Sequence, residues 1–172
     1  EIEERKNIEK ALRISEEKYS QALLCSADAI LICSLSDGRM VEVNETFAEI
    51  SGYSREESIG KTGAELGLWV NFNSRSDFFE LINKKGSINN FESEFKSRTG
   101  NRLTMSLSAE LFEYQEATHL IVIARDITEQ KKTTLALKRY EQIVSASSDL
   151  MAFIDSNYVI QGINDSFLNA IG

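Results

Sequence analysis

The sequence has few of the side chains on which metal sites and nucleophilic catalysis usually depend. Its 172 residues include one histidine, His119, and two cysteines, Cys25 and Cys33, without CxxC spacing. These are too few to assemble a metal site of ordinary ligand count within one chain. No nucleophile elbow is present, and the glycines of residues 60–67 do not form a phosphate-binding loop. We therefore expect no catalysis and no metal, and we expect His119, which precedes an apolar run, to be an edge or turn residue.

Long apolar runs are also missing. The longest, residues 29–33 and 120–124, fall far short of the roughly 20 residues that a membrane-spanning helix needs. The sequence does not open on a charged segment followed by an apolar one, so we expect neither a secretory leader nor direct membrane contact. The two cysteines lie in short apolar surroundings and are expected to be reduced, which agrees with a cytoplasmic location.

Basic charge is in deficit. The chain has 19 basic and 27 acidic side chains, and its formal net charge is −8 at pH 7. Such a surface repels phosphate backbones and anionic lipid headgroups, which argues against a nucleic-acid partner or a membrane-surface module. Hydrophobic residues nevertheless make up 42% of the sequence, which is enough for a folded core.

Residues 1–24 contain neither glycine nor proline and are dense in good helix formers. Ile8, Leu12 and Tyr19 lie on one stripe of an otherwise charged helix. A helix of this kind needs a partner surface to be stable. That surface is either a second copy of the same helix, in a short parallel coiled coil, or the domain that follows in the chain.

The region after this helix changes to short strand and helix patterns. A turn signature occupies residues 36–39, Asn44 is suited to cap a helix, and short helical turns are expected within residues 52–67. An amphipathic helix is expected over 76–84 and should stop near Gly86. Five segments are predicted to be strands: residues 29–33, 40–43, 91–95, 103–111 and 120–124. This order predicts an α+β fold in which an antiparallel sheet carries its helices on one face.

A second charged helix is expected over residues 128–145, and the chain then begins to repeat itself. Ser26-Ala27-Asp28 reappears as Ser147-Ser148-Asp149, and Asn44-Glu45-Thr46-Phe47 reappears as Asn164-Asp165-Ser166-Phe167. The second copy delivers two strands and one helix, without the later helix and strands that would cover them. We expect it to be a truncated repeat that either packs on another chain or is poorly ordered.

An ordered set of short motifs resembles the PAS family of sensor domains. The matching pieces are Ala27-Asp28-Ala29-Ile30, Asp37-Gly38, Val43-Asn44-Glu45-Thr46-Phe47, Gly52-Tyr53-Ser54-Arg55-Glu56-Glu57, Ile59-Gly60-Lys61, Arg98-Thr99-Gly100 and Arg125-Asp126-Ile127-Thr128-Glu129. The resemblance implies four parts: an amphipathic linker helix (1–24), a complete PAS domain (18–129), a second linker helix (129–146) and the truncated start of a second PAS domain (140–172).

This resemblance implies a five-stranded antiparallel sheet that cups a small pocket, with flanking helices that relay its state to an output domain. Asp126, Ile127 and Thr128 would form the joint between the last strand and the next helix, so that a shift of the sheet moves the helix. Asp126 also has a simpler interpretation, as an acid at the positive end of a helix dipole.

The resemblance also raises the question of a cofactor, which the sequence leaves unidentified. Flavin-based light sensing in the family needs a cysteine after the second strand, and none follows Cys33. Haem ligation would need a histidine on the long helix, and residues 76–84 contain none. A flavin held without a covalent bond stays open. The candidate pocket residues are Trp69, Phe72, Phe78, Ile82 and Asn44, with plain core packing and helix capping as the alternative.

The sequence therefore favours a sensory, signal-relay and dimerisation module of a larger signal-transduction protein, without catalysis of its own. The expected parent is a sensor histidine kinase of a two-component system, with the output domain in the same polypeptide and a homodimer formed through the linker helices. Three alternatives stay open: a structural dimerisation spacer without ligand, the input domain of a cyclic-dinucleotide enzyme, and a small-molecule enzyme on an α+β sheet.

Overall fold

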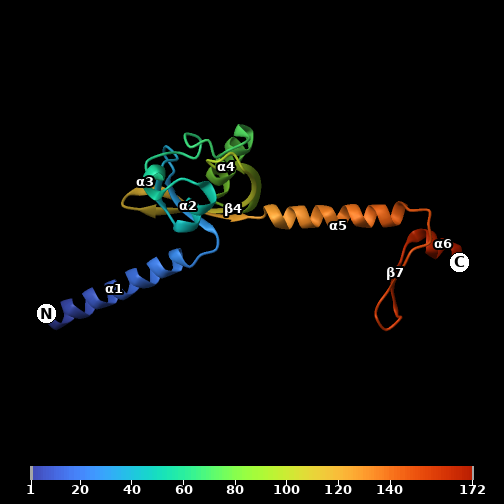
Figure 1. Ribbon diagram of the computed structural model, residues 1–172. Helices are drawn as coiled ribbons and strands as arrows, with labels where there is room; N and C mark the ends of the chain where they lie inside the picture. The colour runs from blue at the N-terminus through green and yellow to red at the C-terminus, as the bar shows by residue number, and fades with distance from the viewer. Residues whose placement is uncertain (1, 172) are drawn as a thin grey trace. The chain divides into compact units, whose positions relative to one another are not determined.

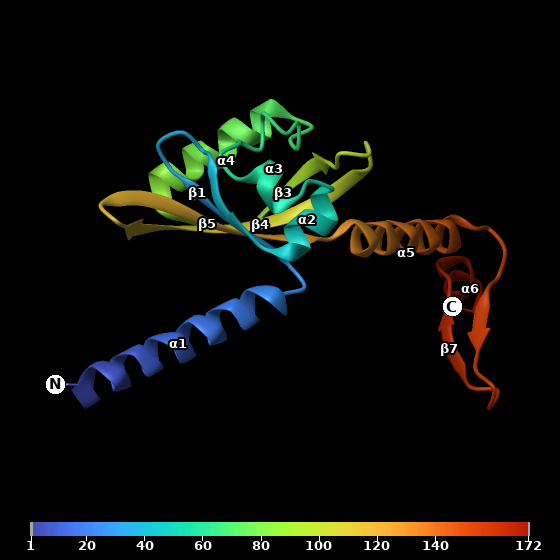
Figure 2. The same cartoon turned by 60° about the vertical axis from the view of Figure 1, so that its left-hand side comes forward.

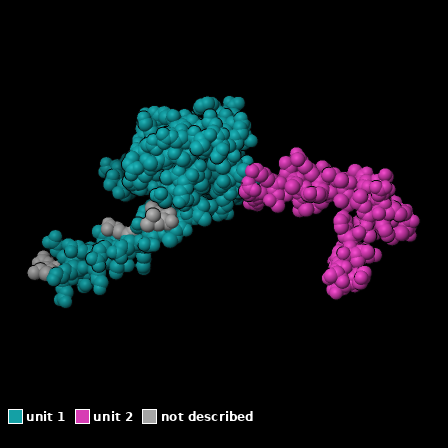
Figure 3. Space-filling model, viewed as in Figure 1, with its two compact units in different colours: residues 1–128 teal, residues 129–172 magenta. Residues whose placement is uncertain are grey.

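The computed structural model describes residues 2–171, without the side chains of residues 2, 4, 16 and 22–24. The chain divides into two compact units, residues 1–128 and residues 129–172 (Figure 3). The first unit contains a five-stranded sheet, and the second contains a two-stranded sheet.

An antiparallel sheet is the framework of the first unit (Figure 1). Its strands are β1 (Ala29–Ser34), β2 (Met40–Val43), β3 (Ser87–Lys96), β4 (Arg102–Tyr114) and β5 (Ala117–Asp126), in the spatial order β2-β1-β5-β4-β3. Helices α2 (Glu45–Ser51), α3 (Arg55–Ser58) and α4 (Phe72–Lys85) lie on one face of this sheet (Figure 2). This is the predicted α+β arrangement, and each of the five predicted strands lies within an observed one.

The alternation of side chains along β4 determines which face of the sheet becomes the core. Residues of odd number on β4 face the helices, and those of even number face the other way. The central strand β5 carries apolar side chains on both faces: Leu120 and Val122 are buried beneath the helices, whereas Ile123 on the other face is 41% exposed. The buried apolar side chains of the helical face include Ala29, Cys33, Met105, Leu107, Ala109, Leu120, Val122 and Ala124.

His119 lies inside the sheet, and the expectation of an edge or turn residue is wrong. It pairs with Ser34 on β1 and with Phe112 on β4. The sequence suggests a turn because the apolar run begins only at Leu120, but β5 itself begins earlier, at Ala117. Backbone pairing on both sides therefore extends beyond the apolar pattern that marks the strand.

Helix α4 begins earlier than its apolar pattern indicates. The predicted start is Ser76, whereas the helix begins at Phe72 because the Asn71 side chain accepts the N–H of Asn73 at 2.9 Å. Its end agrees with the prediction: Gly86 takes a left-handed conformation, with φ of 75°, and donates its N–H to the carbonyl of Ile82.

The buried side chain of Asn44 joins α2 to the start of β1. Its Oδ1 accepts the N–H of Phe47 at 3.0 Å, which caps α2, and the N–H of Ile30 at 2.9 Å. Its Nδ2 donates to the carbonyl of Asp28 at 3.0 Å. The predicted capping role is therefore confirmed, and the same side chain also fixes the backbone of β1 beneath the helix.

An ion pair holds the start of β1 to the end of β5. Arg125 contacts the Asp28 carboxylate through Nε at 3.0 Å and through Nη2 at 2.8 Å. The Arg125 hydrogen bond, which outweighs the opposing effect of burial, lowers the pKa of Asp28 below its usual value. The pair therefore stabilises the corner of the sheet from which both flanking helices leave the strands.

The helices predicted before and after the sheet in the sequence are present as α1 (Ile2–Leu24) and α5 (Thr128–Ala146). In the second unit, α5 is followed by a hairpin of β6 (Ala152–Ile154) and β7 (Ile160–Ile163) and by α6 (Asp165–Ile171). Among the described residues, no helix combines the length and the apolar character that crossing a membrane would require.

Asn44→Ala is expected to destabilise the first unit by about 2–4 kcal/mol, because buried N–H and C=O groups lose their partners at about 1–3 kcal/mol each. Asn71→Ala, which removes an exposed cap, should cost only about 1 kcal/mol. Urea unfolding followed by the fluorescence of Trp69, the one tryptophan of the sequence, measures both. Equal losses from the two variants would contradict the bridging role of Asn44.

Asp28→Asn is expected to lower stability at neutral pH and to have little effect in acid. Because the folded-state pKa of Asp28 is lowered, its ion pair stabilises the protein above the unfolded pKa near 3.9 and is lost as the pH falls through the folded value. Urea midpoints of the parent and the variant should therefore converge from about pH 6 to pH 3. Arg125→Gln should show the same convergence, and a difference independent of pH would refute the assignment.

Candidate functional site

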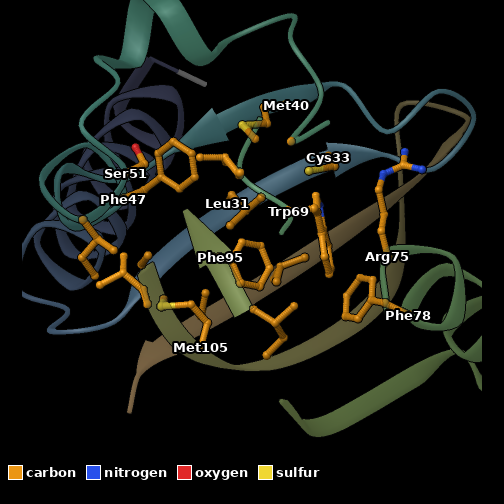
Figure 4. A pocket seen from close by; sticks show the side chains of 18 of the residues that line it. Leu31, Cys33, Met40, Phe47, Ser51, Trp69, Arg75, Phe78, Phe95 and Met105 are labelled. Carbon is orange, nitrogen blue, oxygen red and sulfur yellow. The ribbon is translucent and has the colours of Figure 1, made fainter. Parts of the chain in front are cut away.

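A cavity of about 100 Å³ lies between the helical face of the sheet and helices α2 and α4 (Figure 4). Most of the groups that face it are apolar. The lining residues used below are Ala29, Cys33, Met40, Phe47, Ile50, Trp69, Arg75, Phe78, Phe79, Phe95, Leu103, Met105 and Ala124. An apolar cavity of this kind, between a sheet and the helices over it, is a typical small-molecule site.

Two small residues on neighbouring strands leave space above the sheet. Ala29 and Ala124 face each other across the pair of β1 and β5, so neither strand fills the volume above them. Helix α2 contributes Phe47 and Ile50 from the other side. Because the Asn44 bridge fixes α2 over the start of β1, the width of the cavity depends on that side chain.

Trp69 is held in place by aromatic contacts and by a close approach of the backbone. Its ring lies 4.5 Å from that of Phe95 and 5.9 Å from that of Phe78, centroid to centroid. A Cβ atom at Gly63 would come within 3.1 Å of the indole nitrogen, so only glycine fits there without a shift. Trp69 therefore forms a rigid wall of the cavity.

Of the residues predicted to line a pocket, the structure brings two together in one. Trp69 and Phe78 line the cavity. Ile82 is completely buried in the core but does not line the cavity. Asn44 does not line it, because its side chain is directed to the backbone of Asp28 and β1.

Phe72 does not line the cavity, contrary to the prediction. It is the first residue of α4, and 63% of its surface is exposed. The inward stripe of α4 begins one turn later, with Arg75, Phe78 and Phe79.

Sequence reasoning missed several lining residues. Met105 could have been found, because the alternation along β4 places it on the helical face with Leu103. Arg75 had no such signal, since it lies in the polar stretch Asn73-Ser74-Arg75-Ser76. Its place at the cavity follows only from the start of α4 at Phe72.

Cys33 is a lining residue with an unreactive thiol. Burial, and to a smaller degree the negative charge of Asp37, raises the pKa of Cys33 to about 12. The thiol therefore stays protonated at neutral pH, where it acts as a small apolar group rather than as a nucleophile.

The cavity does not fit the cofactors that the family resemblance brings into question. A cavity of about 150 Å³ accommodates one benzene ring, so the smaller space here cannot enclose the three fused rings of a flavin. Cys33, the cysteine in the lining, lies on β1, whereas the resemblance requires the cysteine of a covalent flavin bond to follow the second strand. His119 is absent from the lining, so haem has no histidine ligand there. At about 100 Å³ the site suits a short chain, and a single ring fits if the lining moves outward slightly.

The joint predicted at the end of the last strand is well defined. The Oδ1 of Asp126 accepts the N–H of Thr128 at 2.8 Å and also its hydroxyl. Thr104 on β4 donates its N–H to the Thr128 hydroxyl oxygen at 2.9 Å and accepts the N–H of Ile127 at the same distance. The joint is therefore tied to β4 as well as to β5.

Comparison with known proteins agrees with this architecture. The sequence pattern of the PAS domain family matches residues 27–129. A curated relative, Protein CrtJ of Rhodobacter capsulatus, is 25% identical over 160 residues, which cover 92% of this chain and 33% of that protein. The chain thus spans about a third of the length of this relative.

Solved structures show the same fold. A PAS domain of an HTR-like protein from Haloarcula marismortui is 23% identical and has a TM-score of 0.58, with coverage of 71% of this chain and 99% of that one. A domain of a sensory box sensor histidine kinase/response regulator from Geobacter sulfurreducens is 24% identical, with a TM-score of 0.55 and coverage of 67% and 96%. A PAS domain from a two-component sensor histidine kinase is 18% identical, with a TM-score of 0.57 and coverage of 66% and 97%. The matched pattern, the sheet and the cavity lead to one conclusion: the chain belongs to the PAS domain family.

Proposed function

We propose that the chain is a sensory and signal-relay module without catalysis of its own. Its cavity binds a small, largely apolar molecule, and the bound state changes the geometry at the start of α5. The observation that carries this proposal is the position of Thr104. It lies on β4 between the lining residues Leu103 and Met105, and its backbone binds Ile127 and Thr128.

The relay follows from the stiffness of this arrangement. Leu103 and Met105 contact the cavity contents from either side of Thr104, so a ligand that displaces them also displaces the Thr104 backbone. The two hydrogen bonds of the Thr104 backbone then transmit the displacement to Ile127 and to Thr128, the first residue of α5. Asp126 in turn accepts the N–H and the hydroxyl of Thr128. Asp126, Ile127 and Thr128 are thus the relay residues, and α5 carries the change toward an output domain in the same polypeptide.

We also propose that residues 140–172 are the start of a second PAS domain, after a complete domain over residues 18–129 and a linker helix over 129–146. The support is atomic: Asn164 accepts the N–H groups of Phe167 and Met151 and donates to the carbonyl of Asp149. Asn44 makes the corresponding bonds in the first unit, and Ser166 likewise bonds Ser147 as Thr46 bonds Ser26.

A homodimer through the linker helices explains the exposed apolar side chains on them. In α1, Ile8 is 63% exposed, Leu12 is 58% exposed and Tyr19 is 55% exposed, although they lie on one stripe. In α5, none of the residues is buried, and Leu137 and Tyr140 project into solvent. Pairing with the same helices of a second copy would remove these surfaces from water.

The parent protein that this module fits best is a sensor histidine kinase of a two-component system. The support is the likeness in fold to PAS domains of sensor histidine kinases, together with linker helices that precede and follow the sheet in the sequence.

Ligand binding in the cavity is expected to be lost when the cavity is filled. Ala124→Leu adds bulk to the lining, so the affinity for single-ring and short-chain compounds should fall by at least about tenfold. Ala136→Leu makes the same change on the exposed surface of α5 and should leave binding unchanged. Quenching of Trp69 fluorescence measures affinity. If no compound binds saturably, the chain is a spacer without ligand. If a compound binds but Ala124→Leu has no effect, the ligand does not occupy this cavity and the proposal is wrong.

A further inference from the structure

Arg75 is a cation at the edge of a mostly apolar cavity. It extends from α4 along the side of the cavity that faces the turn between β1 and β2 (Figure 4). Its guanidinium lies over the ring of Phe79, with the central carbon 4.9 Å from the ring centroid. A Cβ atom at Gly38, in that turn, would lie 3.9 Å from a terminal guanidinium nitrogen. The guanidinium therefore lies between the ring of Phe79 and this turn, and Arg75 as a whole is half-buried.

Arg75 differs from the other arginines of the sheet and its helices in its partners. Between residues 29 and 128, Arg39, Arg55, Arg98, Arg102 and Arg125 each form an ion pair with an aspartate or glutamate. Arg75 forms none with any side chain that the structure describes; its contact is the face of Phe79. Among the arginines of residues 29–128, Arg75 is thus the one without an ion pair to a described side chain.

The charge of the residues that line the cavity also favours an anionic ligand. The chain has a net charge of −8, with 27 acidic side chains. The residues that line the cavity nevertheless include Arg75 and Lys96 and no aspartate or glutamate. A ligand that enters this cavity therefore meets positive charge at its edge, in a protein whose surface is mainly negative.

The chemistry of the guanidinium suits a carboxylate. The group lies over the ring of Phe79, and its N–H donors form a planar fork. A planar carboxylate can accept two of these N–H groups in parallel. Since Arg75 is a half-buried residue, such a pair is less screened by water than one on an open surface.

We propose that the cavity binds a small amphipathic carboxylate. A single ring or a short aliphatic chain occupies the space beside Trp69 and Phe78, and the carboxylate binds the guanidinium of Arg75. This inference rests on the proposed function, because it assigns a ligand class to the same cavity. The volume of about 100 Å³, below the roughly 150 Å³ that holds a benzene ring, limits the apolar part to a short chain or to one small ring for which the lining moves slightly, and it favours neither nucleotides nor flavins.

Phenylacetate and 2-phenylethanol test this assignment, because they share a ring and a two-carbon side chain and differ mainly in charge. Quenching of Trp69 fluorescence should show that phenylacetate binds at least about tenfold more tightly than 2-phenylethanol, as expected for a charged hydrogen-bonded pair. Arg75→Met should bring the ratio of the two affinities close to one. Arg75→Lys, which keeps the charge without the planar fork, should retain part of the preference.

Arg102→Met is the matched control, because Arg102 is an exposed arginine that lies outside the cavity lining. It should leave the ratio unchanged. Unchanged binding of 2-phenylethanol to Arg75→Met shows that the variant is folded and that its cavity is intact.

The outcomes separate this inference from the proposed function. If neither compound binds the parent protein, the proposed function fails. If both bind equally, or if Arg75→Met keeps the preference for phenylacetate, the proposal that the cavity binds a small molecule is retained. The assignment of that molecule as a carboxylate is then overturned. Tighter binding of phenyl phosphate than of phenylacetate would also overturn it, in favour of a phosphate ligand.

Discussion

The hydrogen bonds of the Asn44 side chain determine where α2 lies, and the cavity depends on that position. One side chain caps the helix through Phe47 and fixes the start of β1 through Asp28 and Ile30. Because the amide is buried, each bond forms without competition from water, and losing one would leave a buried polar group unsatisfied. Asn164 makes the corresponding bonds in the second unit, so the same hydrogen-bonding pattern of a helix-capping asparagine occurs twice in one chain.

The cavity and the joint at α5 share one structural element, the strand β4. Leu103, Met105 and Leu107 of this strand line the cavity, while the backbone of Thr104 binds Ile127 and the first residue of α5, Thr128. No separate pathway is needed to link binding with relay, since neighbouring residues of one strand do both. Arg75 adds a charge on the opposite wall, so a charged ligand would draw α4 and the sheet toward a common partner.

The sequence predicted the strands well because β4 alternates strictly and β5 is apolar on both faces. It also predicted the caps at Asn44 and Gly86, whose effect is local. The failures were of two kinds. His119 and Phe72 were misplaced because backbone pairing and capping extend strands and helices beyond their apolar patterns. Arg75 was missed because its role depends on the absence of a carboxylate around it, a property of the folded arrangement rather than of local sequence.

The most direct test of the account is amide hydrogen exchange at Thr104 and Ile127, with and without saturating phenylacetate. These two N–H groups form the bonds between β4 and the start of α5. The account predicts that ligand binding changes the exchange rates of both amides together, along with those of Leu103 and Met105. If the amides of Leu103 and Met105 respond while those of Thr104 and Ile127 do not, the cavity binds its ligand without any relay to α5.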